Sequence, residues 1–367
     1  MPRRRHLGPR SGGSVRRPVV VKLGSSLLAG PGGRVRRSLL RARAEEIARL
    51  VRAGTPVCVV SSGAIALGLP RLGLDRRPRS LPKLQAASAL GQGRLQAAWD
   101  EALARQGIAA AQVLLTTADI ADRAAYLNAR NALAALLALG AVPIVNENDA
   151  TATDEITFGD NDALAAQVAV LTQAKLLVLL TEVDGVYTRA PGTPGAELIH
   201  HGSAASRALL GQASPLGKGG MRSKILAAEL AAQAGIPTVI AGGAGREVLG
   251  PIVAGEPRGT RFPPGERALS SFKLWLRYGK PVAGRLHVDA GARRAIVGEG
   301  ASLLAVGVVA VEGRFAPGEA VELIGPDGRA FAKGIASVSV EELAGRPRGT
   351  EAVHRDRLVV YPEASTR

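Results

Sequence analysis

Two lysines stand beside turns that suit a phosphate group. Lys22 ends the apolar run "VVVK", shortly before Gly24 and the serine pair Ser25 and Ser26. A glycine turn exposes backbone N–H groups and hydroxyls that match phosphate oxygens, and a lysine adds a point charge. The spacing is neither that of a P-loop nor that of a dinucleotide fingerprint, so an ordinary strand–turn–helix remains an alternative at this turn.

The second lysine, Lys224, lies in the first turn of a predicted helix that follows "GKGGMRS". A lysine at that place opposes the helix macrodipole, at a cost of a few tenths of a kcal/mol when it is exposed. Gly219 and Gly220, just before it, allow a phosphate chain to approach the backbone closely. The arrangement favours an anionic partner, and the segment before the helix is typical of a nucleotide-gating loop.

An acid- and amide-rich stretch, "VNENDATATDEITFGDNDALAA" over 145–166, interrupts two apolar runs. One of Asp160, Asn161 and Asp162 would serve as a helix cap, but a single cap does not require all three. Magnesium bound to ATP phosphates takes hard oxygen ligands, usually one or two carboxylates with water. Asp149 and Asn161 would also supply acceptors for the ammonium group of an amino acid.

A serine–glycine turn repeats the pattern of the first lysine site. Ser62 and Gly63 in "VVSSGAIALG" follow a predicted strand and precede an apolar helix. Free N–H groups at that helix start would hold an anion such as a carboxylate. A plain serine N-cap is the alternative interpretation.

These features together indicate phosphoryl transfer. Two lysines would neutralise the charge on the moving group, glycine turns would give N–H donors, and acids would orient lysines and metal. A carboxylate acceptor is already ionised at neutral pH and needs no general base. The sequence shows no histidine or cysteine placed as a nucleophile–base pair, since the five histidines lie in the N-terminal tail, an "IHHG" turn and the last domain.

The elements that must position these residues alternate between strand and helix. Runs such as "RPVVVKL", "TPVCVVSS", "AVPIV" and "AKLLVLLT" are apolar throughout, which is typical of a parallel sheet covered on both faces. In such sheets ligands gather beyond the carboxyl ends of the strands, where the polar motifs stand each time. The fold class predicted is α/β, a three-layer αβα sandwich around a mainly parallel sheet. The stretch 246–272 reads as a connection to a small β-rich domain.

Composition limits the remaining classes of protein. Cys58 is the one cysteine, so no intrachain disulfide forms, and its valine neighbours indicate a small core residue. Apolar runs are too short or too interrupted to span a bilayer, and the Arg-rich start has no apolar segment of a secretory signal. The cytoplasm is the default location. A net charge of +16 leaves binding to nucleic acid open as an alternative.

The ordered set of motifs resembles the glutamate 5-kinases of the amino acid kinase superfamily. The resemblance runs from about Pro18 to Phe262 and includes "VVVKLGSS", "SSGAIALG", "LNARNAL", "VPIVNENDA", "FGDNDALAA", "LLVLLTEVDGVYT" and "GGMRSKILAAELAAQAGI". The tail, from "FKLWLRYGKPVAGRLHVDAG" to "AVHRDRLVV", resembles a PUA domain. The predicted division is therefore a disordered basic leader over 1–17, an amino acid kinase domain over 18–262, a linker over 263–271 and a PUA-like domain over 272–362.

The resemblance implies transfer of the γ-phosphate of MgATP to the side-chain carboxylate of L-glutamate, the first step of proline biosynthesis. It implies that Lys22, Lys224, Asp160 and Asp162 are catalytic, with the two acids organising the lysines and magnesium. Ser62, Asn146, Asp149 and Asn161 would bind glutamate. Nucleotide would contact Lys22, Gly24, Thr181, Glu182, Lys218, Gly219, Gly220, Met221, Arg222, Ser223 and Lys224. Magnesium would be held mainly by the ATP phosphates.

The resemblance also implies partners and regulation. Proline is the expected feedback inhibitor, γ-glutamyl phosphate reductase the downstream enzyme, and a homo-oligomer the expected assembly. Glu182 stands where the family usually has aspartate, and Lys218 and Ser223 replace threonines, which puts nucleotide affinity in question. The leader has no family counterpart, and the last domain is shortened. Acetylglutamate, aspartate, carbamate and uridylate kinases compete within the same fold, and an RNA-binding protein acting through the PUA-like domain is the alternative from another class.

Overall fold

The computed structural model describes residues 16–151, 161–203, 205, 220–265, 269–344 and 349–361. The chain divides into two compact units between residues 268 and 269. The finer boundaries of leader, domain and linker given above stay a prediction. Within the described residues, no helix is both long enough and apolar enough to cross a membrane.

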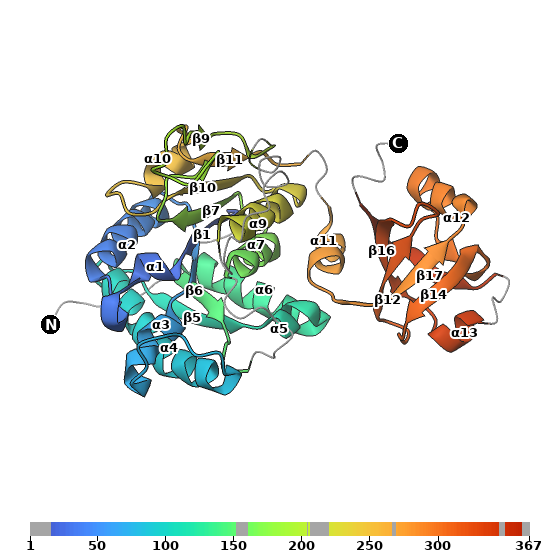
Figure 1. The fold of residues 1–367 in the computed structure, drawn as a ribbon, viewed down its shortest axis with the longest axis horizontal. Coiled ribbons are helices and arrows are strands. Elements are labelled where there is room, and N and C mark those ends of the chain that lie inside the picture. The colour runs from blue at the N-terminus through green and yellow to red at the C-terminus, as the bar shows by residue number, and fades with distance from the viewer. Residues whose placement is uncertain are drawn as a thin grey trace. The chain divides into compact units, whose positions relative to one another are not determined.

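The first unit is built on a sheet of seven strands in the described ranges, in the order β11-β10-β7-β1-β4-β6-β5 (Figure 1). Neighbouring strands pair in parallel except β10 and β11. The central strands are buried along their whole length, which explains their unbroken apolar sequence. The strands are β1 (Val19–Leu23), β4 (Val57–Ser61), β5 (Ala110–Leu115), β6 (Val142–Glu147), β7 (Leu176–Thr181), β10 (Thr238–Gly242) and β11 (Thr260–Phe262).

Helices cover both faces of this sheet. The chain runs outward from β1 through β4 to β5 and then returns, and right-handed crossovers therefore place the earlier and later helices on opposite faces. The first face carries α2 (Arg37–Arg52), α4 (Leu81–Ala104) and α10 (Leu249–Ala254); the second carries α6 (Arg123–Ala138), α7 (Asn161–Leu171) and α9 (Met221–Gln233). The predicted three-layer αβα sandwich is confirmed.

Shorter elements complete the first unit. They are α1 (Ser25–Leu28), α3 (Ala64–Gly68), α5 (Thr117–Ala121), the strand pairs β2 (Ala29–Gly30) with β3 (Arg34–Val35) and β8 (Val186–Tyr187) with β9 (Leu198–Ile199), and the 3-10 turns Pro31–Gly33 and Leu69–Leu72. The predicted connection over 246–272 was wrong in part. This stretch contains α10 and β11. A short edge strand needs few apolar residues, and β11 forms with only Thr260 and Phe262 buried.

The strands send alternate side chains to the two layers. Val19, Val21 and Leu23 belong to the core that also contains Trp99 of α4. Lys22 lies between them in the sequence and therefore points to the other face, toward α7 and α9. Cys58 of β4 is fully buried, and that burial raises the pKa of its thiol to about 12, as expected for an inert core residue.

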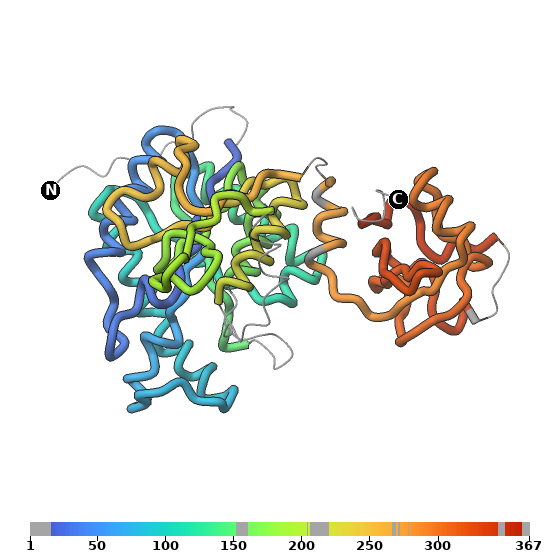
Figure 2. The backbone as a smooth tube through the Cα atoms, turned by 45° about the horizontal axis from the view of Figure 1, so that its top comes forward, coloured from blue at the N-terminus to red at the C-terminus, as the bar shows by residue number. Residues whose placement is uncertain are grey.

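A close helix crossing lies at one end of this unit, where α3 meets α4 (Figure 2, light blue). A Cβ atom on Gly91 would lie 1.8 Å from the carbonyl oxygen of Ala64, and one on Gly68 would lie 1.8 Å from that of Ala87. Only glycine allows the two backbones to approach so closely. This contact accounts for the first glycine of the "GQG" inside α4, whereas Gly93 has open space around its Cα.

The second unit is a β-rich domain with six strands in its described part, in the order β13-β17-β16-β15-β12-β14. They are β12 (Val282–Val288), β13 (Leu303–Leu304), β14 (Val308–Gly313), β15 (Ala320–Ile324), β16 (Ala330–Ala336) and β17 (Glu351–Val360). The helices are α11 (Ser271–Tyr278), α12 (Ala290–Arg294) and α13 (Val340–Ala344), with a π-turn over Ala295–Glu299 and a 3-10 turn over Ala305–Gly307. Leu286, Leu323 and Phe331 are among its core residues. The predicted β-rich C-terminal domain is confirmed.

Candidate active site

Both predicted lysines converge on one carboxylate. The amino group of Lys22 lies 2.7 Å from Oδ1 of Asp162, and that of Lys224 lies 3.1 Å from Oδ2. Lys22 comes from β1, Lys224 from the first turn of α9 and Asp162 from the first turn of α7. All three are nearly buried, with exposed fractions of 5%, 7% and 1%. Two positive charges and one negative charge therefore meet at the carboxyl edge of the sheet.

The surroundings keep Asp162 ionised. Burial alone would raise the pKa of its carboxyl, but the charges of Lys22 and Lys224 outweigh that effect. The Ser223 hydroxyl also donates a hydrogen bond of 2.7 Å to Oδ2. The net result is a pKa below the usual value for aspartate. Lys224 is thus a buried lysine at its helix start that is paired with the carboxylate of Asp162.

An amide network lies beside this ion cluster. Asn161, the first residue of α7, donates from Nδ2 to the Ser62 hydroxyl at 2.9 Å and to Oδ1 of Asn146 at 2.8 Å. Asn146 in turn donates from its own Nδ2 to Oε1 of Gln92 on α4 at 2.8 Å. Oδ1 of Asn161 has no hydrogen-bond partner in the part of the chain that the structure describes. Within the described residues, the network therefore presents a buried acceptor without a donor, one residue before Asp162.

Asp149 lies three residues after Asn146, in the turn that follows β6. It is 6% exposed, and its Oδ2 accepts a 2.6 Å hydrogen bond from the hydroxyl of Ser88 on α4. Burial raises the pKa of Asp149; the Ser88 hydrogen bond and the charge of Arg77 act against this increase without cancelling it. Its Oδ1 meets no donor among the described residues. Buried acceptors without a donor are what an ammonium ligand would require.

Two of the three glycine turns are extended, and the third is left-handed. Gly24 is extended and precedes α1, and a Cβ there would lie 3.8 Å from the Lys22 amino nitrogen. Gly63 has a φ of +109° and is itself the N-cap of α3. The alternative of Ser62 as an N-cap is therefore wrong, because its hydroxyl is engaged with Asn161. Gly220 is the extended N-cap of α9.

The residues predicted to contact nucleotide are only partly in view. Thr181 ends β7 opposite Gly242 of β10, and its carbonyl accepts a 2.7 Å hydrogen bond from the backbone N–H of Gly243. Glu182 follows directly at the same edge. Met221, Arg222 and Ser223 form the first turn of α9 with Lys224. Asp160, Lys218 and Gly219 lie outside the described residues.

Sequence reasoning missed the two residues of α4 in this site, Ser88 and Gln92. They are four residues apart and therefore share one face of the helix. Polar side chains at that spacing in an otherwise Ala- and Leu-rich segment were an available signal. The sequence could not show which element this face meets, because Asp149 and Asn146 lie more than fifty residues away.

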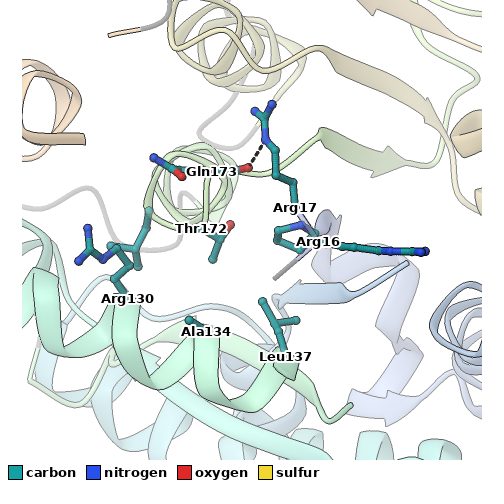
Figure 3. Close-up of a pocket in the computed structure, with 9 residues that line it drawn as sticks. Arg16, Arg17, Arg130, Ala134, Leu137, Thr172 and Gln173 are labelled. Carbon is teal, nitrogen blue, oxygen red and sulfur yellow. Dashed lines mark hydrogen bonds between the residues drawn. The ribbon is translucent and has the colours of Figure 1, made fainter. Parts of the chain in front are cut away.

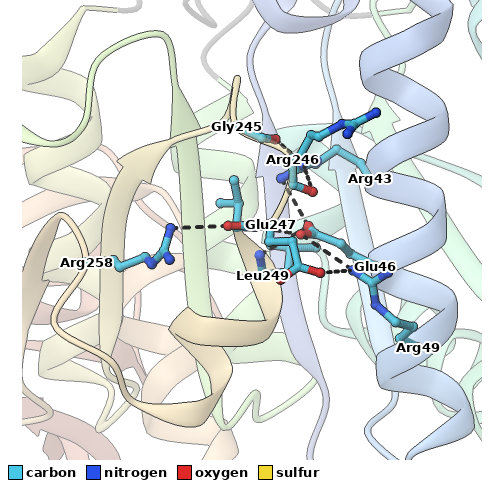
Figure 4. Close-up of polar contacts among 9 residues, drawn as sticks. Arg43, Glu46, Arg49, Gly245, Arg246, Glu247, Leu249 and Arg258 are labelled. Carbon is cyan, nitrogen blue, oxygen red and sulfur yellow. Dashed lines mark hydrogen bonds and ion pairs between the residues drawn. The ribbon is translucent and has the colours of Figure 1, made fainter.

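A second unpredicted cluster fixes the loop after β10 (Figure 4). Glu46 of α2 accepts hydrogen bonds from the backbone N–H groups of Val248 at 2.6 Å and Leu249 at 3.1 Å, where α10 begins. Arg43 pairs with Glu46 at 3.0 Å and donates to the carbonyls of Gly245 and Arg246. Arg43 and Glu46 are fully or almost fully buried. We call these two residues the α2 latch.

A separate pocket of about 230 Å³ lies at the other edge of the sheet and contains none of the predicted site residues (Figure 3). It lies between the start of β1, α6 and the end of α7. Arg17 donates to the carbonyls of Gln173 and Ala174 at the end of α7. The side chains of Arg16, Arg17 and Arg130 point in three directions and do not form a common anion site.

The described residues provide no cluster of three or more His, Cys, Asp or Glu side chains for a metal ion. Both oxygens of Asp162 already contact lysine amino groups. The donor set here therefore fits a magnesium ion carried mainly by nucleotide phosphates, which needs only one or two protein carboxylates.

The geometry agrees with comparisons to known proteins. The model of the amino acid kinase family matches residues 17–242, and that of the PUA domain matches 284–355. These matches define the class, an amino acid kinase domain followed by a PUA domain.

Curated relatives refine this class. The glutamate 5-kinase of Gloeobacter violaceus is 48% identical over 365 residues, covering 93% of this chain and 98% of that protein. Those of Sphingopyxis alaskensis and Geobacter sp. (strain M21) are 47% and 42% identical, each covering 93% of this chain and 97% of the relative. The chain belongs to the amino acid kinase family, in its glutamate 5-kinase branch.

Proposed function

We propose that this chain transfers the γ-phosphate of ATP to the side-chain carboxylate of L-glutamate, giving γ-glutamyl phosphate, the first step of proline biosynthesis. The observation that carries the proposal is the meeting of two buried lysines on Asp162 at the carboxyl edge of the sheet. The relatives that match almost the full length of the chain bear the same activity in their names.

Lys22 and Lys224 act on the transferring phosphoryl group. Asp162 contacts both amino groups before substrate arrives, so little reorganisation is needed when negative charge moves between the reactants. A glutamate carboxylate oxygen attacks the γ-phosphorus while the bond to the β–γ bridging oxygen breaks and ADP leaves. Catalysis is then mainly positioning and electrostatic stabilisation. Asp160 supports the same lysines and magnesium in this proposal.

The amide network and Asp149 bind glutamate. Oδ1 of Asp149 and Oδ1 of Asn161 are buried acceptors that match its ammonium group. Ser62 and Asn146 hold Asn161 in place through their hydrogen bonds. The side-chain carboxylate of glutamate is then directed toward the lysines.

Nucleotide binds across the ends of β1 and β7 and the start of α9. The proposed contacts are Lys22, Gly24, Thr181, Glu182, Lys218, Gly219, Gly220, Met221, Arg222, Ser223 and Lys224. When bound together with ATP, magnesium would offset the charge of the phosphates. Proline inhibition, a homo-oligomeric assembly, cytoplasmic location and a downstream γ-glutamyl phosphate reductase complete the proposal.

A panel of acceptors tests the activity and its specificity together. The chain is incubated with MgATP, hydroxylamine and glutamate, N-acetylglutamate or aspartate, and hydroxamate formation is measured. We expect hydroxamate with glutamate and little with the other two. Preference for N-acetylglutamate would assign a different kinase of the same fold. RNA binding by 272–362 in a gel-shift assay, with no hydroxamate from any acid, would replace the proposal with an RNA-binding function.

A further inference from the structure

Asp149 presents its two carboxylate oxygens differently. Oδ2 is held by the Ser88 hydroxyl at 2.6 Å, the shortest of the side-chain hydrogen bonds described in this site. Oδ1 is buried without a donor among the described residues. A carboxylate held at one oxygen has its other lone pairs directed to one place.

Ser88 reaches Asp149 from a rigid part of the molecule. It is 3% exposed and lies on α4, one turn before Gly91, where α4 touches α3 most closely. Gln92, one turn further on, accepts a hydrogen bond from Nδ2 of Asn146 through its own Oε1. Asp149, in contrast, lies in the turn that follows β6. The helix therefore fixes a side chain whose own backbone segment has no regular structure.

We propose that Ser88 is a positioning residue for substrate binding, whose hydroxyl holds Oδ2 of Asp149 so that Oδ1 faces the ammonium group of the amino-acid acceptor. The inference rests on the proposed function, since it takes an amino acid as the ligand of Asp149. It adds a residue of α4 that neither the sequence motifs nor the family match singles out.

The same hydrogen bond affects the ionisation of Asp149. Among the described residues, the groups that act on the ionisation of this carboxylate are the Ser88 hydroxyl on α4 and the charge of Arg77 in the segment before α4, and both oppose the effect of burial. Removal of the hydroxyl therefore raises the pKa of Asp149 further. The acid limb of kcat/KM for glutamate, which reports the free enzyme, should move to higher pH.

The test compares Ser88→Ala with the unchanged full chain in the hydroxamate assay, over a pH series. We expect the KM for glutamate to rise about tenfold, or about 1.4 kcal/mol, with kcat changed less than about twofold. Ser88→Cys, which retains a weak donor of similar size, should give an intermediate KM. Thr172→Val removes a remote hydroxyl that donates to the carbonyl of Val168 and serves as the matched control.

A double variant decides whether Ser88 acts through Asp149. Ser88→Ala combined with Asp149→Asn should raise KM no more than Asp149→Asn alone, because the removed contact no longer matters. Additive effects, or a lowered melting temperature with KM and the acid limb unchanged, would overturn the proposal. If Ser88→Ala does not fold, Ser88→Cys gives the same comparison. Failure of the unchanged chain to phosphorylate glutamate would instead overturn the proposed function.

Discussion

At the scale of residues, the site depends on a carboxylate that has more positive than negative charge around it. Asp162 contacts two lysines and a serine hydroxyl, and it is almost completely buried. A buried charge is tolerated only when it is paired and hydrogen-bonded. Asp162 therefore offsets the free-energy cost of burying the two lysine amino groups in the folded protein, before any substrate binds.

Asp162→Asn should therefore reduce both activity and stability. It removes the negative charge that both nearly buried amino groups contact, which we expect to cost about 3 kcal/mol of unfolding free energy at neutral pH. Urea unfolding of the variant and the unchanged chain measures the difference. An equally stable variant would show that the lysines are solvated in the free protein.

The acid dependence follows from the direction of the pKa shift. The pKa of Asp162 is lowered in the folded chain, so its contribution to stability is present above the usual aspartate pKa and is lost as pH falls through the lowered value. The stability difference between the unchanged chain and Asp162→Asn should shrink as the pH falls below the usual aspartate pKa of about 4. A difference independent of pH would assign the effect to packing.

At the scale of elements, α4 is placed against α3 by a close contact at Gly91, which lies next to Gln92 and one turn after Ser88 in the same helix. Gly91→Ala should push α3 and α4 apart, lowering the unfolding free energy by about 2 kcal/mol and raising the KM for glutamate. Gly93→Ala is the matched control, because it sits in the same helix with open space around it. That change should stabilise the chain by about 0.5 to 1 kcal/mol. Equal effects from the two substitutions would contradict the close crossing.

The α2 latch gives a second prediction at this scale. Glu46→Gln keeps the shape of the side chain but leaves Arg43 buried without its partner and turns a donor toward backbone N–H groups. We expect a loss of about 3 kcal/mol in urea unfolding. Glu247 lies in the same loop and forms an exposed ion pair with Arg49 of α2. Glu247→Gln should therefore change the unfolding free energy by less than about 0.5 kcal/mol. If Glu46→Gln were as stable as Glu247→Gln, the α2 latch would not contribute to the stability of the fold.

The elements themselves were predictable where one chemical pattern dominates. Continuous apolar runs identified β1, β4, β6 and β7, and Gly54 and Gly140 follow the ends of α2 and α6 as left-handed residues. The sequence did not predict the short elements α10 and β11, because their burial depends on partners far away in the chain. Likewise the motifs indicated Lys22 and Lys224, but their common partner and the α4 contacts arise only from the tertiary structure.

At the scale of the whole molecule, every described residue of the candidate site lies in the first unit. A chain ending at residue 268 should therefore form hydroxamate from glutamate with a KM within about threefold of the full chain. Circular dichroism checks that the shortened chain is folded. A folded but inactive product would mean that the second unit completes the site.

The lone thiol of the molecule provides a built-in signal. Cys58 is fully buried in the seven-stranded sheet, so a maleimide reagent cannot reach it while the sheet is closed. Burial also raises the pKa of its thiol to about 12, which keeps the thiol protonated and unreactive at neutral pH. The second unit has no sulfhydryl at all. The rate of labelling at neutral pH should consequently follow the opening of the sheet alone, and ATP with glutamate should slow that rate if both are gripped at its edge. One labelling reagent, with no engineered mutation, would thus report the local opening of the first unit without any signal from the second.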